Sequence, residues 1–139
     1  MSVRTAWIEV ATKGHGDTVD LTAEARAAVQ ESGLRDGTLT LFVPGSTAGI
    51  TTIEFEPGAV ADFRRLFDEV APVDREYRHH LTWGDDNGHA HVRAALLGPG
   101  LTVPFVQGEL TLGTWQQIVL CDFDTRSRNR RVAAQLIGE

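Results

Sequence analysis

Four of the five histidines in this sequence fall within one short segment, where they could transfer protons or bind a metal ion. They are His79, His80, His89 and His91. The residues between the two pairs, Gly84-Asp85-Asp86-Asn87-Gly88, have the composition of a turn. A turn there would return the first pair toward the second, so this segment is the first candidate for a functional site.

The segment from His89 to Leu97 is interpreted as a β-strand that begins with His-Ala-His. Alternate residues of a strand point to the same side, with their Cα atoms about 7 Å apart. His89 and His91 would therefore project together, and Arg93 would share their face. The opposite face is apolar and can pack on the core through Ala90, Val92, Ala94 and Leu96.

Three interpretations of these histidines are compatible with their spacing. In the first, His79, His89 and His91 bind a divalent metal such as zinc, because three imidazoles that leave one position open form a known catalytic zinc arrangement. Asp85 or Asp86 would then orient a ligand imidazole. In the second, the histidines are acid–base groups without a metal, which suits proton transfer near neutral pH. In the third, they are polar residues on a solvated strand face.

Anion binding is the second chemistry that the sequence offers. The guanidinium group of Arg93 matches a phosphate or a carboxylate, and a surface ion pair is the alternative. The small residues from 44 to 49 could cradle an anion or form a plain turn. Trp115 could form a wall for a flat ligand or pack in the core. The expected substrate-binding residues are Arg93, Ser46, Thr47, Asn87, Trp115 and Gln116, and the expected catalytic residues are His79, His91 and Asp86.

Two helices are predicted in the first half of the chain. Residues 22 to 32 place apolar side chains at helical spacing, with Thr22 as a plausible N-cap and Gly33 as the stop. Pro57 suits the first position of a second helix. The apolar stripe expected to bury that helix consists of Val60, Phe63, Phe67 and Val70.

The rest of the chain is predicted to be mostly β-strand. The expected strands cover residues 3–11, 38–43, 50–55, 89–97, 101–106, 109–112, 117–123 and 131–137, with a tight turn at Gln107-Gly108. Helices grouped beside antiparallel strands indicate an α+β domain, sandwich-like, with two helices packed against it. The arginines at 126, 128, 130 and 131 are interpreted as a solvated turn, with a phosphate anchor as the alternative.

Bulk composition narrows the class of protein. The chain has 139 residues, which fits a single domain over residues 1–139. Its formal net charge of -6 argues against nucleic acid or an anionic membrane as the partner. The one cysteine, Cys121, cannot form an intrachain disulfide, and no apolar run suits a signal peptide or a membrane helix. We therefore expect a cytoplasmic protein.

Taken together, these motifs resemble the YjbQ-like family, also called the secondary thiamine-phosphate synthase family. The similarity covers nearly the whole chain and is densest in Tyr77-Arg78-His79, Asp86 to Arg93, Leu96-Leu97-Gly98, Leu112 to Gln116 and Phe123-Asp124. The resemblance implies antiparallel strands with helices on one side, and a homotrimer with histidines near a subunit boundary. It also implies a weak ability to make thiamin phosphate, which indicates that the main reaction is another one.

The sequence departs from the family pattern at several positions. Gly45 stands where the family usually has a histidine, and Ala95 replaces a common serine. Arg93 replaces a usual lysine, and residues 53 to 56 replace the usual Asn-Glu-Asn. His89 occupies a position that is often not histidine, which suggests the hypothesis that it compensates for the side chain missing at Gly45.

The function that we expect is an enzyme of unknown native reaction. It would act on a small phosphorylated or otherwise anionic metabolite, with a histidine-rich site that binds a divalent metal such as zinc or transfers protons. Thiamin-phosphate synthesis is expected to be weak or absent. The alternative is a non-catalytic protein that binds a small ligand or a metal.

Overall fold

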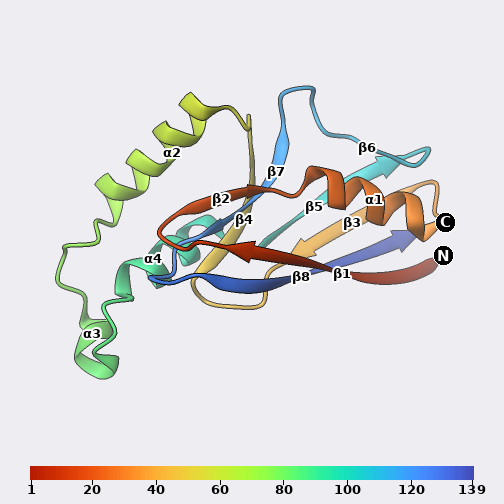
Figure 1. Ribbon diagram of the computed structural model, residues 1–139. Coiled ribbons are helices and arrows are strands. Elements are labelled where there is room, and N and C mark those ends of the chain that lie inside the picture. The colour runs from red at the N-terminus through yellow and green to blue at the C-terminus, as the bar shows by residue number, and fades with distance from the viewer.

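The computed structural model describes all 139 residues and arranges them as two antiparallel sheets with four helices (Figure 1). The first sheet has the strand order β1-β8-β3-β5-β6, and the second has the order β2-β7-β4. The strands are β1 (Ser2–Thr12), β2 (Asp17–Asp20), β3 (Gly37–Phe42), β4 (Ala48–Ile53), β5 (Gly100–Val106), β6 (Glu109–Leu110), β7 (Gln117–Asp122) and β8 (Arg128–Gly138). The helices are α1 (Thr22–Ser32), α2 (Pro57–Val70), α3 (Arg78–Trp83) and α4 (Gly88–Leu97). The predicted α+β class is confirmed.

The main core is formed by the inward side chains of both sheets together with α1. In β3, burial alternates so that Leu39 and Leu41 are fully buried while their neighbours are exposed. This alternation is what a half-buried strand requires, because successive side chains point to opposite faces. Helix α1 contributes Ala25 and Val29 to the same core.

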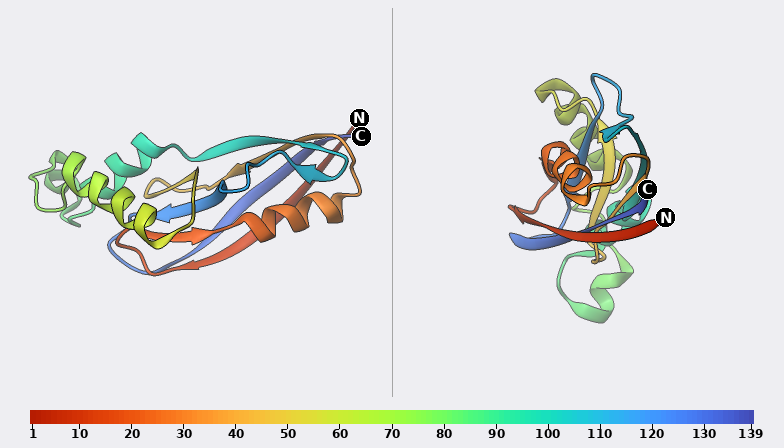
Figure 2. Two further views of the ribbon diagram at one scale, coloured as in Figure 1. Left: turned by 90° about the horizontal axis from the view of Figure 1, so that it is seen from above. Right: turned by 90° about the vertical axis from the view of Figure 1, so that its right-hand side faces the viewer.

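A second, smaller core lies on the other face of β7. Ile118 and Leu120 belong to the main core, whereas Val119 and Cys121 pack with Phe67 of α2. Strand β7 is therefore buried on both faces, which explains its nearly continuous apolar sequence. The second core holds α2 and α4 at one end of the sheets, and the two chain termini lie together at the other end (Figures 1 and 2).

Several local predictions are confirmed. Helix α1 has the predicted bounds, and Gly33 ends it in the left-handed conformation. Gln107 and Gly108 both have positive φ angles, as a tight hairpin turn between β5 and β6 requires. Helix α2 begins at Pro57, and the Glu56 side chain caps it by accepting from two backbone amides. Of the stripe expected to bury α2, only Phe67 is fully buried.

The prediction of a strand over residues 89–97 is wrong, because this segment forms α4. Its second half, Ala94-Ala95-Leu96-Leu97, consists of the strongest helix formers, and the polar–apolar alternation stops there. Helices α3 and α4 bring the number of helices to four rather than two. The short strand β2 was not predicted, since four residues pairing with β7 leave little periodic signal. None of the four helices is long and apolar enough to cross a membrane.

Candidate functional site

Helix α4 turns His89 and His91 away from each other. Two residues apart on a helix, they point in directions roughly 200° apart. His89 is buried, with its ring centroid 6.4 Å from that of Tyr77, and shares the buried face with Arg93 one turn later. His91 is only partly buried. The expectation that His89, His91 and Arg93 share one face is therefore wrong.

His79 and His91 do meet, across the interface between α3 and α4. Their ring centroids lie 4.3 Å apart, with the ring planes inclined by 39°. Asp85 Oδ1 lies 3.2 Å from Nδ1 of His79, although the two atoms are not in hydrogen-bonding geometry. The structure thus brings together two of the three predicted histidines, with a carboxylate beside one of them.

The three-histidine metal site is not assembled within one chain. No group of three histidine, cysteine, aspartate or glutamate side chains is arranged to hold a metal ion. His89 cannot join the other two, because it lies on the buried face of α4. His79 and His91 could supply two ligands, so metal binding stays a prediction that needs a further ligand from elsewhere.

Asp86 does not approach the His79–His91 pair in the way that its expected catalytic role requires. Its Oδ1 lies 3.0 Å from Nδ1 of His80, and both side chains are exposed. Asp86 also adopts a positive φ of 54° within the turn that leads to α4. The structure therefore places Asp85, not Asp86, beside the candidate proton-transfer histidines.

Three buried polar atoms without a hydrogen-bond partner occur in this same segment: Nδ1 of His79, Oδ1 of Asn87 and Nδ1 of His89. Asp85 is close to His79 but outside hydrogen-bonding geometry. Burial lowers the pKa of His89, and the nearby Arg93 guanidinium lowers it further. His89 is thus held in its neutral form, with one ring nitrogen available to a partner.

The start of α4 also carries backbone amides that have no hydrogen-bond partner within the helix. The first amides of any helix lack a partner within it. Asn87 is the N-cap residue of α4, but its side chain makes no capping hydrogen bond. Gly88 is also buried, and a side chain on it would collide with Tyr77. The chain backbone therefore packs tightly beside α3, with polar groups of Asn87 and His89 left unpaired.

A buried ionic network lies next to this segment. Arg130 binds Asp122 with two hydrogen bonds, of 2.7 Å from Nε and 2.9 Å from Nη2. Arg130 also donates to Oγ1 of Thr47 at 2.7 Å, and Thr12 donates to Asp122 at 2.6 Å. Burial alone would raise the pKa of Asp122, but the hydrogen bonds from Arg130 and Thr12 outweigh it and lower the pKa. The pair is therefore fully ionised in the interior.

Asp124 connects the network to the histidine segment. It accepts hydrogen bonds from Thr47 at 2.9 Å and from Arg128 at 3.0 Å. Burial raises its pKa, but these bonds and the nearby Asn87 side chain lower it by more. Asp124 is also one of the charges that act on His89.

Sequence reasoning missed this network. Arg130 is buried rather than part of a solvated turn. One pattern in the sequence could have indicated it. Like charges recur two residues apart, as on one face of a strand, first at Asp122 and Asp124 and then at Arg128 and Arg130. Two acidic and two basic residues on the same faces of neighbouring segments predict mutual pairing.

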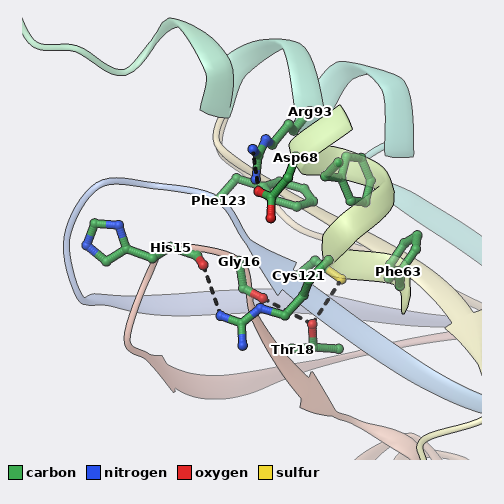
Figure 3. A pocket seen from close by; sticks show the side chains of 10 residues that line it. His15, Gly16, Thr18, Phe63, Asp68, Arg93, Cys121 and Phe123 are labelled. Atoms are coloured by element: carbon green, nitrogen blue, oxygen red, sulfur yellow. Dashed lines mark hydrogen bonds and ion pairs between the residues drawn. The ribbon is translucent and has the colours of Figure 1, made fainter. Parts of the chain in front are cut away.

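Arg93 has a different role from the one expected. Its Nε donates to the Ala71 carbonyl at 2.9 Å and its Nη2 donates to Asp68 at 3.1 Å. These bonds fasten α4 to the end of α2, on the side where Figure 3 shows Arg93 pointing toward Asp68. Arg93 therefore does not hold an anion against the His79–His91 pair.

The loop of small residues from 44 to 49 has both buried and exposed side chains. Thr47 is buried in the ionic network, whereas Ser46 is exposed. Gly45 has a φ of 143°, and a side chain on it would meet Nη1 of Arg130 at 2.9 Å. Gly45 and His89 therefore both lie near the same network, Gly45 beside Arg130 and His89 within the influence of the Asp124 charge.

Trp115 and Gln116 lie in the loop before β7. Gln116 accepts from the Gly113 amide at 3.0 Å and donates to Thr52 at 3.2 Å, so it holds the loop in place. Trp115 is 73% exposed and does not pack in the core. No hydrogen bond or ion pair joins either residue to the histidine segment.

Comparison with known proteins assigns the whole chain to one group. A family model described as "UPF0047 protein YjbQ-like" matches residues 6–139. A UPF0047 protein of Methanothermobacter thermautotrophicus is 34% identical over 139 residues, which cover 100% of this chain and 95% of that protein. The UPF0047 protein YugU of Bacillus subtilis is 36% identical over 132 residues, covering 94% of this chain and 97% of YugU.

Solved structures have the same fold. A YbjQ-like protein of unknown function from Sulfolobus solfataricus superimposes with a TM-score of 0.90 at 31% identity, covering 99% of this chain and 100% of that one. A hypothetical protein from Aeropyrum pernix gives a TM-score of 0.91 at 30% identity, covering 98% and 99% of the two chains. The architecture described above is therefore shared across these proteins.

Proposed function

Because the chain belongs to the UPF0047 family of YjbQ-like proteins, we propose that it is an enzyme that binds a small anionic metabolite at the start of α4. His79 and His91 form the proton-transfer pair beside the bound metabolite. The observation that carries this proposal is that the three partnerless buried polar atoms all belong to residues 79 to 89.

A buried polar atom without a partner destabilises a fold by about 1–3 kcal/mol. Such atoms are rare in folded proteins, and where they occur an ion, a ligand or an ordered water molecule often supplies the missing partner. Here His79, Asn87 and His89 each carry one, within a single turn and its two flanking helices. A bound ligand that supplies donors and acceptors would remove this cost.

The charge of the ligand follows from the groups around it. The start of a helix favours negative charge, because its amides and dipole point toward the bound group. Arg128 is about one-third exposed beside Asp124 and so can reach a ligand. Asp124 itself is already engaged by Thr47 and Arg128. A phosphorylated or carboxylated metabolite fits this surrounding.

Proton transfer is the chemistry that His79 and His91 support. Imidazole gives and takes protons near neutral pH, and a carboxylate beside one ring fixes its orientation. Asp85 lies 3.2 Å from Nδ1 of His79 and could bond to it after a small side-chain rotation, and the partly exposed rings of His79 and His91 contact each other. A metal ion such as zinc could use the same two histidines if a further ligand came from another molecule.

We also propose that the protein assembles as a homotrimer, as the family resemblance implies. Four large apolar side chains are exposed on α3 and α4, the helices that carry the histidine pair: Leu81, Trp83, Val92 and Leu96. Large exposed apolar side chains grouped on neighbouring helices suit contact with another molecule. A subunit boundary there would cover this surface and enclose the site.

The binding step can be tested with inorganic phosphate as the probe, by NMR titration of the uniformly ¹⁵N-labelled protein. We expect the amide signals of residues 87 to 89 to shift, and His91→Gln to weaken the affinity at least about tenfold, as for loss of a charge-assisted hydrogen bond. The matched control is His80→Gln, which changes an exposed histidine of the same segment. Unchanged affinity in His91→Gln would contradict the proposal.

The rival function is a non-catalytic small-ligand protein. For an enzyme, His79→Gln should abolish turnover of an identified metabolite while leaving its affinity within a few-fold, because proton transfer acts in the transition state. For a binding protein, the same change should lower only the affinity. Measuring both quantities on one metabolite therefore separates the two functions.

A further inference from the structure

A cavity lies between α2, β2, β7 and α4, and its lining does not include His79 or His91 (Figure 3). Its volume is about 250 Å³. Arg93 lines it from the buried face of α4, one turn after His89. The lining includes none of His79, Asn87, His89 and His91, so the cavity is a different site from the one at the start of α4.

One wall of the cavity is aromatic. The rings of Phe63 and Phe67 are 4.9 Å apart, and those of Phe67 and Phe123 are 4.7 Å apart. Cys121 also lines the cavity, and burial raises the pKa of its thiol to about 11, so the sulfur is neutral. This wall suits an apolar or flat ligand body.

Two guanidinium groups that line the cavity have donors to spare. Arg64 donates from Nη2 to the His15 carbonyl at 3.0 Å, and its Nε and Nη1 make no hydrogen bond. The Arg93 side chain is only 6% exposed, and its Nη1 makes none either. Asp68 balances one of these two charges. The lining is left with one net positive charge and unpaired donors.

We propose that this cavity binds a small monocarboxylic acid, with the carboxylate on Arg64 and the apolar body against Phe63 and Phe67. A guanidinium fork matches a carboxylate in geometry, and one negative charge matches the residual charge of the lining. The volume lies below the 300–1,000 Å³ typical of sites for drug-sized ligands, which limits the acid to a small one.

Inorganic phosphate fits this cavity less well than a carboxylic acid. At neutral pH it carries between one and two negative charges, because its second pKa is near 6–7. Its oxygens would also face the aromatic wall, where no donor is available. The same cavity thus selects for an acid that has an apolar part.

The probe for this proposal is benzoate, titrated into the full chain and followed by the backbone amide signals of Gly16, Thr18 and Cys121. We expect saturable shifts of these signals, and an affinity at least about tenfold lower in Arg64→Gln. Arg65→Gln is the matched control, since Arg65 is exposed and pairs only with Asp62 and Glu69. It should leave the affinity unchanged.

Two further titrations make the outcome decisive. Benzyl alcohol, which lacks the charge, should bind at least about tenfold more weakly than benzoate. His91→Gln should bind benzoate as the unmodified chain does, because this cavity is separate from the histidine pair. Three results would each overturn the proposal: no shift of the three amides with benzoate, an equal affinity for inorganic phosphate measured from these same three amides, or an unchanged benzoate affinity in Arg64→Gln. Arg64 is exposed, so its replacement does not threaten folding.

Discussion

His79 of α3 and His91 of α4 hold their rings 4.3 Å apart, although twelve positions separate them in the sequence and neither belongs to a sheet. The contact depends on the tight turn through Gly84 and Asp86, which returns the chain so that α4 packs against α3. Gly88 allows this close approach, since any side chain there would collide with Tyr77. The geometry of the pair is thus set by backbone packing.

The stability of the fold should depend on pH through His89. Burial lowers the pKa of His89 in the native state, whereas the unfolded chain takes up that proton near pH 6.5. The unfolded state then binds more protons, so the free energy of unfolding should fall as the pH drops below about 6.5. Urea unfolding at pH 7.5 and pH 5.5 measures this difference.

The control for that experiment is the same pair of measurements in two variants. His89→Gln should lose part of the decrease between the two pH values, because no imidazole remains to be protonated at this position. His80→Gln changes an exposed histidine and should keep the full decrease. An equal decrease in all three proteins would show that His89 is not held neutral.

Removal of one partner from the Asp122–Arg130 pair should be costly. Asp122→Asn removes the carboxylate that forms both short bonds to the buried guanidinium of Arg130 and leaves only Asp124 at 3.9 Å, so a loss of about 3 kcal/mol in the free energy of unfolding is expected. The comparison is Glu9→Gln, which removes an exposed partner of Arg131 and should cost less than about 1 kcal/mol. Denaturant unfolding at pH 7 compares the two, and similar losses would contradict the buried pairing.

Introducing at position 45 the histidine that the family resemblance implies should destabilise this chain. Gly45 has a φ of 143°, which side chains rarely adopt, and a Cβ there would meet Nη1 of Arg130 at 2.9 Å. We expect Gly45→His to cost about 1–3 kcal/mol through backbone strain alone. Thermal unfolding tests this, with Ser46→His as the control because Ser46 is exposed in the same loop. An equal melting temperature for Gly45→His and the unmodified chain would contradict it.

The sequence indicated the fold better than the site. Strand β3 and helix α1 follow simple periodic patterns, since each buries one face only. The segment from His89 to Leu97 was predicted as a strand because polar and apolar residues alternate at its start. It forms a helix because strong helix formers follow at its end and because it packs against α3. The burial of Arg130 was also not predicted. Arg130 meets its partner Asp122 only in the folded structure, where the end of β7 lies beside β8.

Thiamin-phosphate synthesis should be slow or absent. The family resemblance implies a histidine and a serine where this chain has Gly45 and Ala95, and Ala95 is exposed on α4. A steady-state assay with the pyrimidine pyrophosphate and the thiazole phosphate is expected to give turnover below the ordinary enzyme range of about 1–1000 per second. A rate within that range would mean that the missing side chains are dispensable.

Zinc binding is the sharpest test of the histidine geometry. If zinc binds to the protein, His79 and His91 should both be required, because their rings are in contact, whereas His89 is turned into the interior. In calorimetric titration of chelator-treated protein, we expect His91→Ala to weaken zinc binding at least about tenfold, since it removes one of only two histidine ligands. His89→Ala, compared after confirming that it remains folded, should leave the affinity nearly unchanged. Equal weakening in His89→Ala and His91→Ala would instead restore the three-histidine site and require α4 to rearrange when the metal binds.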